Sequence, residues 1–401
     1  MSKKRNVKIA KRIQLWAQDQ ASGVQLYFLA FIIFLCGETL STTMFPTPGK
    51  VYFICKVLPV LLVGVKILLF DRYSRRGFLV IAAVILDSVL VIAASGYMEA
   101  FFWVMMVIGA KNVPWRKILQ IYIVVSLSIV FLAFCASLFD VIENLQYIRD
   151  DELQLVRNSF GAIYTTDFAS HIFTLLLASF YLLKEKLETW HIVTGIVIAS
   201  LIYLFCLTRL DVGCMLLTLA IFAIINFRRK GKLCRVKYET GNFQKKIVWC
   251  MPFAAALMFA ASTAYSSGMS IFVKLDGIMS GRLMLGHKGL VKYGITLFGQ
   301  QIDMVGNGGV AEQVKDYFFV DCSYLYVFLR YGLIFLVIVL GTYVLCCKKY
   351  QKDPYFLAAI VLVAINCMIA HHLVELAYNP FALALLAKCE PDMMREMRVK
   401  I

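Results

Sequence analysis

Three arginines have the type and position in this chain that best suit a role in ligand binding: Arg157, Arg209 and Arg282. Each lies in a gap between apolar segments, and Arg209 lies in LTRLD, a tight turn that leaves little room for an incidental charge. An arginine stays charged and offers a planar fork of donors that matches phosphate or carboxylate. Together the three indicate an anionic ligand such as a pyrophosphate head group, although each alone also fits a solvated cation.

Histidine and acidic residues near the same gaps are the candidates for proton transfer. His287 follows Arg282 in a long gap, and Glu375 lies at the end of an apolar run. His371, Glu375 and Asn379 are four residues apart, so on a continuous helix they would share one face. This polar stripe fits either plain pairing at a helix end or a site with a general base. We predict that the base is His287 or Glu375.

No pattern in the sequence demands a metal or another cofactor, and we expect neither. His-x3-Glu alone is a weak zinc pattern, and no second cluster accompanies it. The twelve cysteines lie mostly in or beside apolar segments and form no CxxC pair, so neither a cysteine metal site nor a disulfide framework is expected. A phosphate loop, a dinucleotide fingerprint and a nucleophile elbow are also missing.

Membrane helices must position these candidates. The chain is 61% hydrophobic and 16% charged, which is more apolar surface than a soluble protein of 401 residues can cover. The apolar runs are continuous rather than alternating, which excludes a membrane β-barrel. We predict an all-α polytopic membrane protein with residues 1–401 in a single integral membrane domain. About twelve spans are expected, of which the fourth and twelfth are short: 24–44, 51–70, 78–95, 98–110, 118–139, 163–183, 190–207, 210–227, 247–265, 322–345, 355–371 and 373–388.

Basic residues determine the predicted orientation. Of the 41 Lys and Arg residues, 29 lie in the gaps that we assign to the cytoplasm and 9 in the alternate gaps. The positive-inside rule therefore puts both termini in the cytoplasm, with MSKKRNVKIAKR as an anchor, and turns the three arginines outward. The net charge of +16 serves orientation and contact with anionic lipid. Nucleic-acid binding is not expected, because no basic stripe is interleaved with exposed aromatic residues.

Two gaps are long, and both face outward in this topology. Residues 140–162 follow the fifth span and residues 266–321 follow the ninth. The second loop is rich in apolar residues, and its segment Leu275–Phe298 fits an interfacial helix on the outer leaflet.

Charges inside the predicted spans bear on an alternative function. Arg330 lies about 12 Å into the tenth span at the helical rise, and we expect Asp87 or Glu38 to pair with it. Lys56 is a further interior charge. If these charges formed a continuous relay, they would favour a transporter.

In architecture and in a series of short motifs the chain resembles bacterial polysaccharide polymerases of the Wzy type, which are related to the O-antigen ligases. The architectural likeness consists of the spans, the cytoplasmic termini and the enlarged outer loops after spans five and nine. The motifs, in chain order, are Arg157, Phe160 and Gly161 with Asp167–Phe168–Ala169; Thr208–Arg209; Asp276 with Ser280–Gly281–Arg282; Asp321 with Tyr324–Leu325 and Gly332; and Glu375 with Asn379.

The resemblance implies a GT-C-like glycosyltransferase of the bacterial cytoplasmic membrane with its active face outward. Such an enzyme joins oligosaccharide repeat units carried on undecaprenyl pyrophosphate, without a nucleotide sugar. The partners implied are these lipid-linked oligosaccharides, membrane lipid, a chain-length regulator and a flippase. The substrate-binding residues implied are Arg157, Arg209, Arg282, Asp321, Tyr324 and Asn379.

Two other functions remain open, a flippase or transporter of lipid-linked sugars and a glycan ligase like the O-antigen ligases. The large, partly apolar outer loop favours the polymerase over the transporter, because a transporter needs no catalytic cover on one side. The ligase uses the same chemistry with a different acceptor, and the residues do not separate the two.

Overall fold

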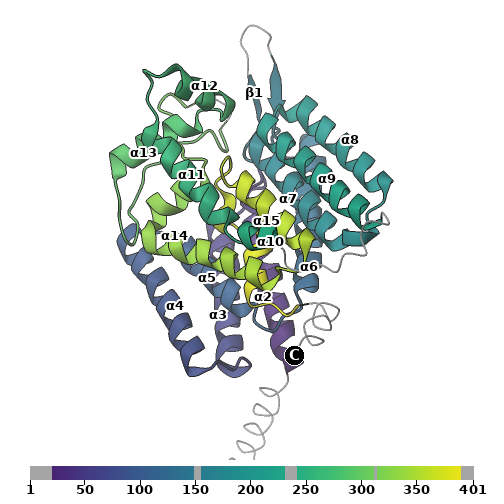
Figure 1. Ribbon diagram of the computed structural model, residues 1–401, viewed down its shortest axis with the longest axis vertical. Coiled ribbons are helices and arrows are strands. Elements are labelled where there is room, and N and C mark those ends of the chain that lie inside the picture. Colours follow the sequence, from purple (N-terminus) through teal and green to yellow (C-terminus); the bar gives the residue numbers. More distant parts are fainter. Residues whose placement is uncertain (1–19, 149–154, 231–241, 311–313, 390–401) are drawn as a thin grey trace, which may run out of the picture.

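Helices dominate the structure, a computed structural model that describes residues 20–148, 155–230, 242–310 and 314–389 (Figure 1). Eight of the described helices are long and apolar enough to cross a membrane, which confirms the prediction of a mostly helical, multi-pass membrane protein. The predicted anchor MSKKRNVKIAKR lies outside the described residues. The eight are α2 (Gln20–Leu40), α3 (Gly49–Leu69), α4 (Arg75–Ser95), α6 (Trp115–Leu138), α7 (Thr165–Leu183), α8 (Thr189–Cys206), α9 (Arg209–Lys230) and α14 (Ser323–Lys349). Shorter helices are α5 (Glu99–Gly109), α10 (Asn242–Ile247), α11 (Cys250–Ala264), α12 (Ser270–Ile278), α13 (Arg282–Tyr293) and α15 (Pro354–Asn366).

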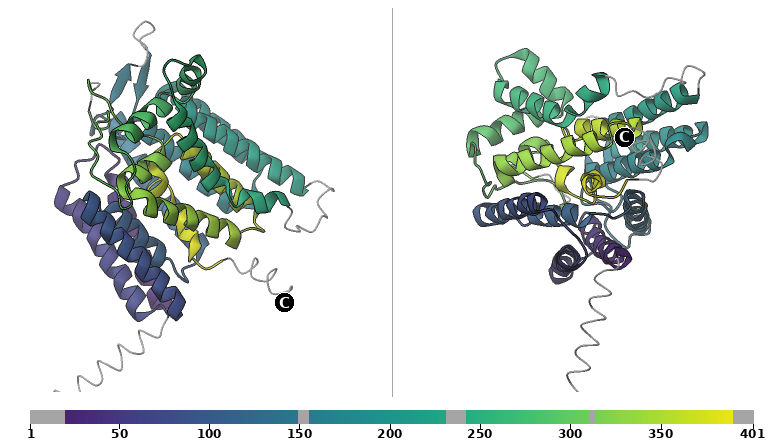
Figure 2. Two further views of the ribbon diagram at one scale, coloured as in Figure 1. Left: turned by 60° about the vertical axis from the view of Figure 1, so that its left-hand side comes forward. Right: turned by 60° about the horizontal axis from the view of Figure 1, so that its bottom comes forward.

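The peripheral helices expose apolar side chains, whereas two helices form the centre. Leu68 on α3 and Phe78 on α4 are largely exposed, and both helices lie at the edge of the bundle (Figure 2). Lipid tails are as apolar as leucine, so such exposure is tolerated in a bilayer. Helices α7 and α14 are mostly buried and supply much of the core. Helices α7 and α14 therefore form the buried centre around which the other helices pack.

Helix α14 is kinked at Gly332, where a loop segment presses against it. The backbone there has φ of +87°, and a Cβ atom on Gly332 would lie 2.3 Å from the carbonyl oxygen of Leu297. The amide of Leu333 donates to the carbonyl oxygen of Thr296 at 2.9 Å, which partly replaces the broken helical bonds. Only glycine meets both the positive φ and the close approach.

The twelfth predicted span, 373–388, is wrong as a helix. The chain there forms two short 3₁₀ helices, η3 (His372–Val374) and η4 (Pro380–Leu385). Pro380 has no amide hydrogen to continue a helix and disfavours helical backbone in the residue before it. His371, Glu375 and Asn379 therefore do not form the stripe on one helix face that their spacing suggested. The fourth predicted span is the short helix α5.

Both long loops carry secondary structure, and they contact each other. Residues 140–162 form the hairpin of β1 (Gln146–Ile148) and β2 (Val156–Asn158), which pairs Tyr147 with Arg157. The loop of residues 266–321 contains α12 and α13, where Leu275–Phe298 suggested one interfacial helix. The hydroxyl of Tyr147 lies 3.0 Å from the carbonyl oxygen of Asn307 and 2.8 Å from that of Val310. The hairpin therefore holds the second loop in place.

The interior charges do not pair as predicted. Arg330 stacks over the ring of Tyr97, with its Cζ 3.6 Å from the centroid, and donates to the hydroxyl of Tyr326. Glu38 forms an ion pair with Lys56. The expected pairing of Arg330 with Asp87 or Glu38 is therefore wrong, because aromatic faces and a lysine take these roles instead.

Candidate functional site

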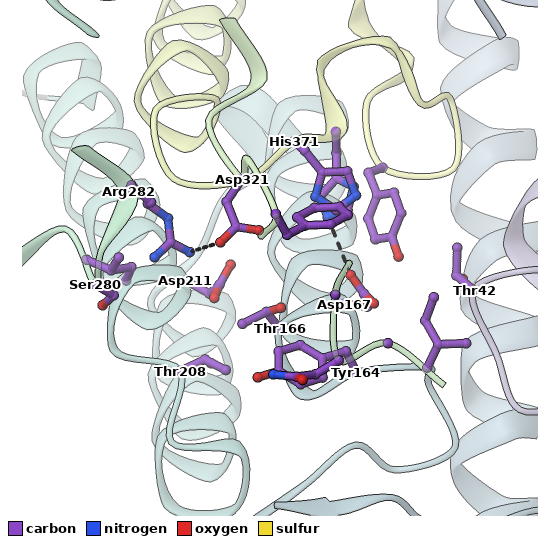
Figure 3. A pocket seen from close by; sticks show the side chains of 18 of the residues that line it. Thr42, Tyr164, Thr166, Asp167, Thr208, Asp211, Ser280, Arg282, Asp321 and His371 are labelled. Carbon is purple, nitrogen blue, oxygen red and sulfur yellow. Dashed lines mark ion pairs between the residues drawn. The ribbon is translucent and has the colours of Figure 1, made fainter. Parts of the chain in front are cut away.

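A cavity of about 340 Å³ lies next to the two long loops (Figure 3). Its walls come from Thr42 and from residues within 157–167, 207–211, 280–282, 306–308, 317–321 and 371–378. The charged and histidine side chains that line it are Arg157, Asp167, Arg209, Asp211, Arg282, Asp321, His371, His372 and Glu375.

Four helices begin at the walls of this cavity. Helices α7, α9, α13 and α14 start at Thr165, Arg209, Arg282 and Ser323, and the cavity is lined by residues in or beside each first turn. The first amides of a helix lack partners within it, and the helix dipole places partial positive charge there. Asp167 and Asp211 lie in two of these first turns. With Asp276, which accepts from the first amides of α13, carboxylates already stand at three of these helix starts. The positive charge available to an anionic ligand therefore comes from the arginines.

Arg157 and Arg209 reach the cavity from neighbouring elements. Arg157 lies on β2, and its Nε donates to the carbonyl oxygen of Cys206 at 3.0 Å, at the end of α8. Arg209 begins α9 and is exposed. The residues that the structure describes supply no hydrogen bond or ion pair to its guanidinium. Its donors are therefore available for a ligand.

Arg282 is held by its surroundings more firmly. Asp276 of α12 accepts hydrogen bonds from the amides of Leu283 and Met284, which fixes the start of α13. The Nε of Arg282 donates to the carbonyl oxygen of Ile369 at 2.6 Å, and Nη2 lies 3.6 Å from Oδ2 of Asp321. Arg282 thus ties the large loop to the turn after α15 and keeps only part of its donor set for a ligand.

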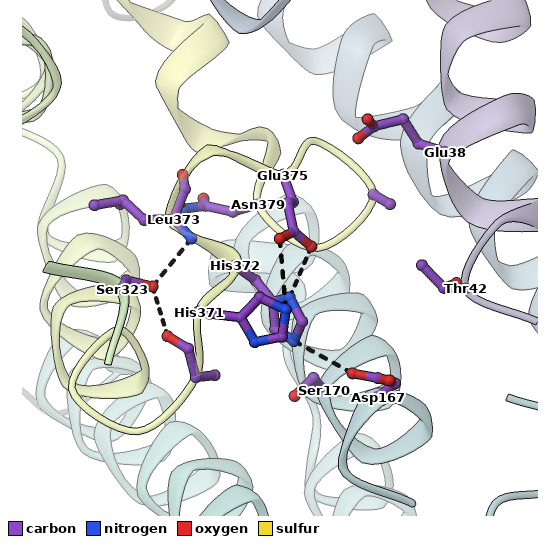
Figure 4. Close-up of polar contacts among 12 residues, drawn as sticks. Glu38, Thr42, Asp167, Ser170, Ser323, His371, His372, Leu373, Glu375 and Asn379 are labelled. Atoms are coloured by element: carbon purple, nitrogen blue, oxygen red, sulfur yellow. Dashed lines mark hydrogen bonds and ion pairs between the residues drawn. The ribbon is translucent and has the colours of Figure 1, made fainter. Parts of the chain in front are cut away.

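A second cluster, on the turn after α15, consists of His371, His372 and Glu375 (Figure 4). His372 Nδ1 lies 2.9 Å from Oε2 of Glu375, and His371 Nε2 lies 3.6 Å from its Oε1. On its other side, His372 Nε2 lies 3.7 Å from Oδ1 of Asp167. Ser323 at the start of α14 accepts from the amide of Leu373 at 3.1 Å, which fixes the turn.

Burial shifts the protonation of the groups around the cavity. Desolvation lowers the pKa of His371 and of His372 to about 3, so both imidazoles are neutral at physiological pH. Desolvation raises the pKa of Glu375, and His371 and Lys56 oppose that rise. The pKa of Asp321 is also raised by burial, against the effect of Arg282. These directions are typical of groups set apart from bulk water.

The structure brings together five of the predicted site residues and leaves out three. Arg157, Arg209, Arg282, Asp321 and Glu375 all line the cavity. The other three lie elsewhere and have structural partners: His287 Nδ1 is 3.0 Å from the carbonyl oxygen of Ser262, Tyr324 donates to that of Ala364, and Asn379 contacts Tyr343 and Leu373. His287, Tyr324 and Asn379 therefore do not line this cavity, and their predicted roles stay predictions.

Sequence reasoning did not select several residues that line the cavity. Asp211 lies two residues after Arg209 in the LTRLD turn, and that proximity was a usable signal. Asp167 stands in the motif around Arg157, but its depth in α7 is visible only in the fold. On the helix expected there, His372 would point about 100° away from the face shared by His371 and Glu375, so it was not chosen as a site residue.

Comparison with protein-family models, with curated proteins and with solved structures finds no match to this chain.

Proposed function

We propose that the protein is a GT-C-like glycosyltransferase that polymerises lipid-pyrophosphate-linked oligosaccharide repeat units at the outer face of the bacterial cytoplasmic membrane. The observation that carries this proposal is the convergence of Arg157, Arg209 and Arg282, from distant parts of the chain, on one cavity. Its size and its position beside membrane-spanning helices suit the head group of a lipid whose tail stays in the bilayer.

Diphosphate is the anion that this site suits best. Arginine forks bind phosphate oxygens in pairs. Arg209, whose guanidinium has no hydrogen-bond or ion-pair partner among the described residues, lines the same cavity as Arg157 and Arg282. In glycosyl transfer the diphosphate gains negative charge as it leaves, so such donors stabilise the transition state more than the ground state.

The reaction needs an acceptor for one proton. The hydroxyl of the acceptor unit attacks the anomeric carbon of the growing chain, a C–O bond forms, and the bond to the lipid diphosphate breaks with both electrons on the diphosphate. The hydroxyl proton passes to a base. Of the two bases expected from sequence, Glu375 lines the cavity and His287 does not, so Glu375 is the proposed base.

The interior charges favour the polymerase over the transporter. Lys56 pairs with Glu38, and Arg330 lies among tyrosine rings, although its Nε has no hydrogen-bond partner among the described residues. Asp87 is buried and its carboxylate has no hydrogen-bond partner there either, but it does not line the cavity. Lys56, Glu38 and Arg330 do not line the cavity either. A charged substrate path through the bundle would need such groups along its walls. The glycan ligase shares the site chemistry and differs only in the acceptor.

Cells that lack the protein test the proposal against its main alternative. A missing polymerase leaves single repeat units on the lipid carrier at the outer face, where a membrane-impermeant label reaches them. A missing flippase leaves the same units at the inner face, protected from the label until the membrane is opened. Labelling of intact cells supports the polymerase, and labelling only after permeabilisation contradicts it.

A further inference from the structure

The turn after α15 brings three metal-binding side chains to one point. His371, His372 and Glu375 each present a ligand atom, and these atoms all lie within 4.8 Å of one another. We propose that they bind one divalent transition-metal ion, for which Zn²⁺ fits the donor set best. Two imidazole nitrogens and one carboxylate are a ligand set that zinc accepts, with a fourth position left open. His-x3-Glu did not predict this site, because the third ligand is the adjacent histidine.

The distances among the three side chains allow a shared ion. Zinc–ligand bonds of about 2.0–2.1 Å at a tetrahedral angle put ligand atoms roughly 3.4 Å apart. His372 Nδ1 lies 2.9 Å from Oε2 of Glu375, and His371 Nε2 lies 3.6 Å from the other carboxylate oxygen, Oε1. All three ligand atoms lie within 4.8 Å of one another, so small side-chain shifts would bring them to zinc distances. A hydrogen bond accounts for His372, but 3.6 Å is too long for one to His371. An ion between them accounts for both rings facing one carboxylate.

A carboxylate lies behind one of the ligands, as in many metal sites. His372 turns its other ring nitrogen to Asp167, with Nε2 3.7 Å from Oδ1 (Figure 4). At this separation Asp167 acts on the imidazole through its charge, and a small movement would bring it to hydrogen-bond length, where such a partner orients a metal-binding ring. Tyr378 stacks on the ring of His372 with centroids 3.7 Å apart, and Phe319 meets His371 edge-on at 4.9 Å. Both rings are thus held in place before any ion arrives.

Two of the cations nearest the cluster are engaged by other groups. Lys56 is paired with Glu38, and Arg330 is stacked on Tyr97. The carboxylates of Glu375 and Asp167 remain to balance the ion. Because the three ligands line the cavity, the open coordination position faces the space in which the diphosphate is proposed to bind.

The metal proposal does not rest on the polymerase proposal. An ion bound here is measurable in the absence of any glycan or lipid substrate. The two proposals use Glu375 differently: it is the proposed base in the metal-free chain and a ligand when the ion is bound. The proposed role of the arginines is the same in either case.

The test uses the full chain in nanodiscs, stripped with a chelator and titrated with ZnCl₂ against a chromophoric zinc indicator. The variants are His371→Ala, Glu375→Gln and Asp167→Asn, and the matched control is His287→Ala, a histidine outside the cavity. Gel filtration and thermal melting of each variant report on folding. Co²⁺ substitution gives a visible spectrum that reports the ligand geometry.

We expect the wild-type chain to bind one ion, and we expect the control His287→Ala to bind it equally well. Asp167→Asn should weaken binding about 10- to 100-fold, the usual effect of losing an outer partner, and His371→Ala and Glu375→Gln should weaken it further. Equal binding by folded wild type and by these two variants would overturn the site, as would the absence of Zn²⁺ and Co²⁺ binding. If zinc binding fails this test, the effect of Arg209→Ala on diphosphate binding still tests the proposed function independently.

Discussion

Replacing Arg209 by alanine should weaken binding of undecaprenyl diphosphate with little effect on folding. Its guanidinium is exposed at the cavity and has no described partner, so the protein loses nothing internal when it is removed. A hydrogen bond to a charged group contributes about 1.5–3 kcal/mol. Because 1.4 kcal/mol corresponds to a factor of ten, the dissociation constant should rise about 10- to 150-fold.

Arg282→Ala should behave differently, because this arginine also supports the fold. Its removal leaves the carbonyl oxygen of Ile369 and the carboxylate of Asp321 without their partner. An unsatisfied buried polar group costs about 1–3 kcal/mol, so the melting temperature should fall along with the affinity. Arg209→Ala should lower affinity alone.

The assay is titration of undecaprenyl diphosphate into protein in nanodiscs, with undecaprenol as the uncharged control ligand. Arg76→Ala, an exposed arginine at the start of α4 away from the cavity, is the matched control variant. Added salt should weaken binding to wild type more than to Arg209→Ala, because one ionic contact is already missing. If Arg209→Ala binds the diphosphate as wild type does, the reasoning from the unpaired guanidinium is refuted.

Three further predictions concern the structure that holds the site. Gly332→Ala should destabilise the protein by more than about 1–2 kcal/mol, since the positive φ alone costs that much. Gly341→Ala should be tolerated, because no atom lies within 4 Å of its added Cβ. Thermal melting compares the two variants, and equal melting temperatures would contradict the role given to the kink. Tyr147→Phe should release the contact between the two loops, seen as faster amide exchange in both, and unchanged exchange would show that the hydroxyl does not hold them. Lys56→Met should lower the free energy of unfolding by about 3–5 kcal/mol, because it leaves the largely buried Glu38 without its partner. Adding Glu38→Gln should restore much of this stability. A double variant less stable than Lys56→Met alone would disprove the pairing.

Sequence patterns predicted the positions of most membrane helices well, because each one can be recognised from the apolar residues of its own segment. Most span limits, such as 51–70 and 118–139, lie within a few residues of α3 and α6. The error at 373–388 has a local cause, since apolar composition outweighed the signal of Pro380. A 3₁₀ segment buried by the protein itself can be as apolar as a membrane helix, so composition alone does not distinguish the two.

The site was only partly predictable, and the reason differs between residues. Arginine in a tight turn is visible in sequence, which is why Arg209 was found. His287 was favoured because it follows Arg282 in the same loop, yet the turn of α13 directs it to the carbonyl of Ser262. The approach of Asp167 to His372 joins residues from α7 and the end of the chain, and no local pattern encodes such a distant contact.

The most direct test of the central claim is polymerisation by the purified protein. Cells that lack the protein supply their own accumulated lipid-linked oligosaccharide, so the sugars need not be known in advance. This extract is added to the protein in nanodiscs, without nucleotide sugar, and the glycans are separated by size. The account predicts a ladder of products spaced by one repeat unit, lost with Arg209→Ala and kept with Arg76→Ala. A folded wild-type protein that binds the extract and leaves every glycan at its starting length would contradict it.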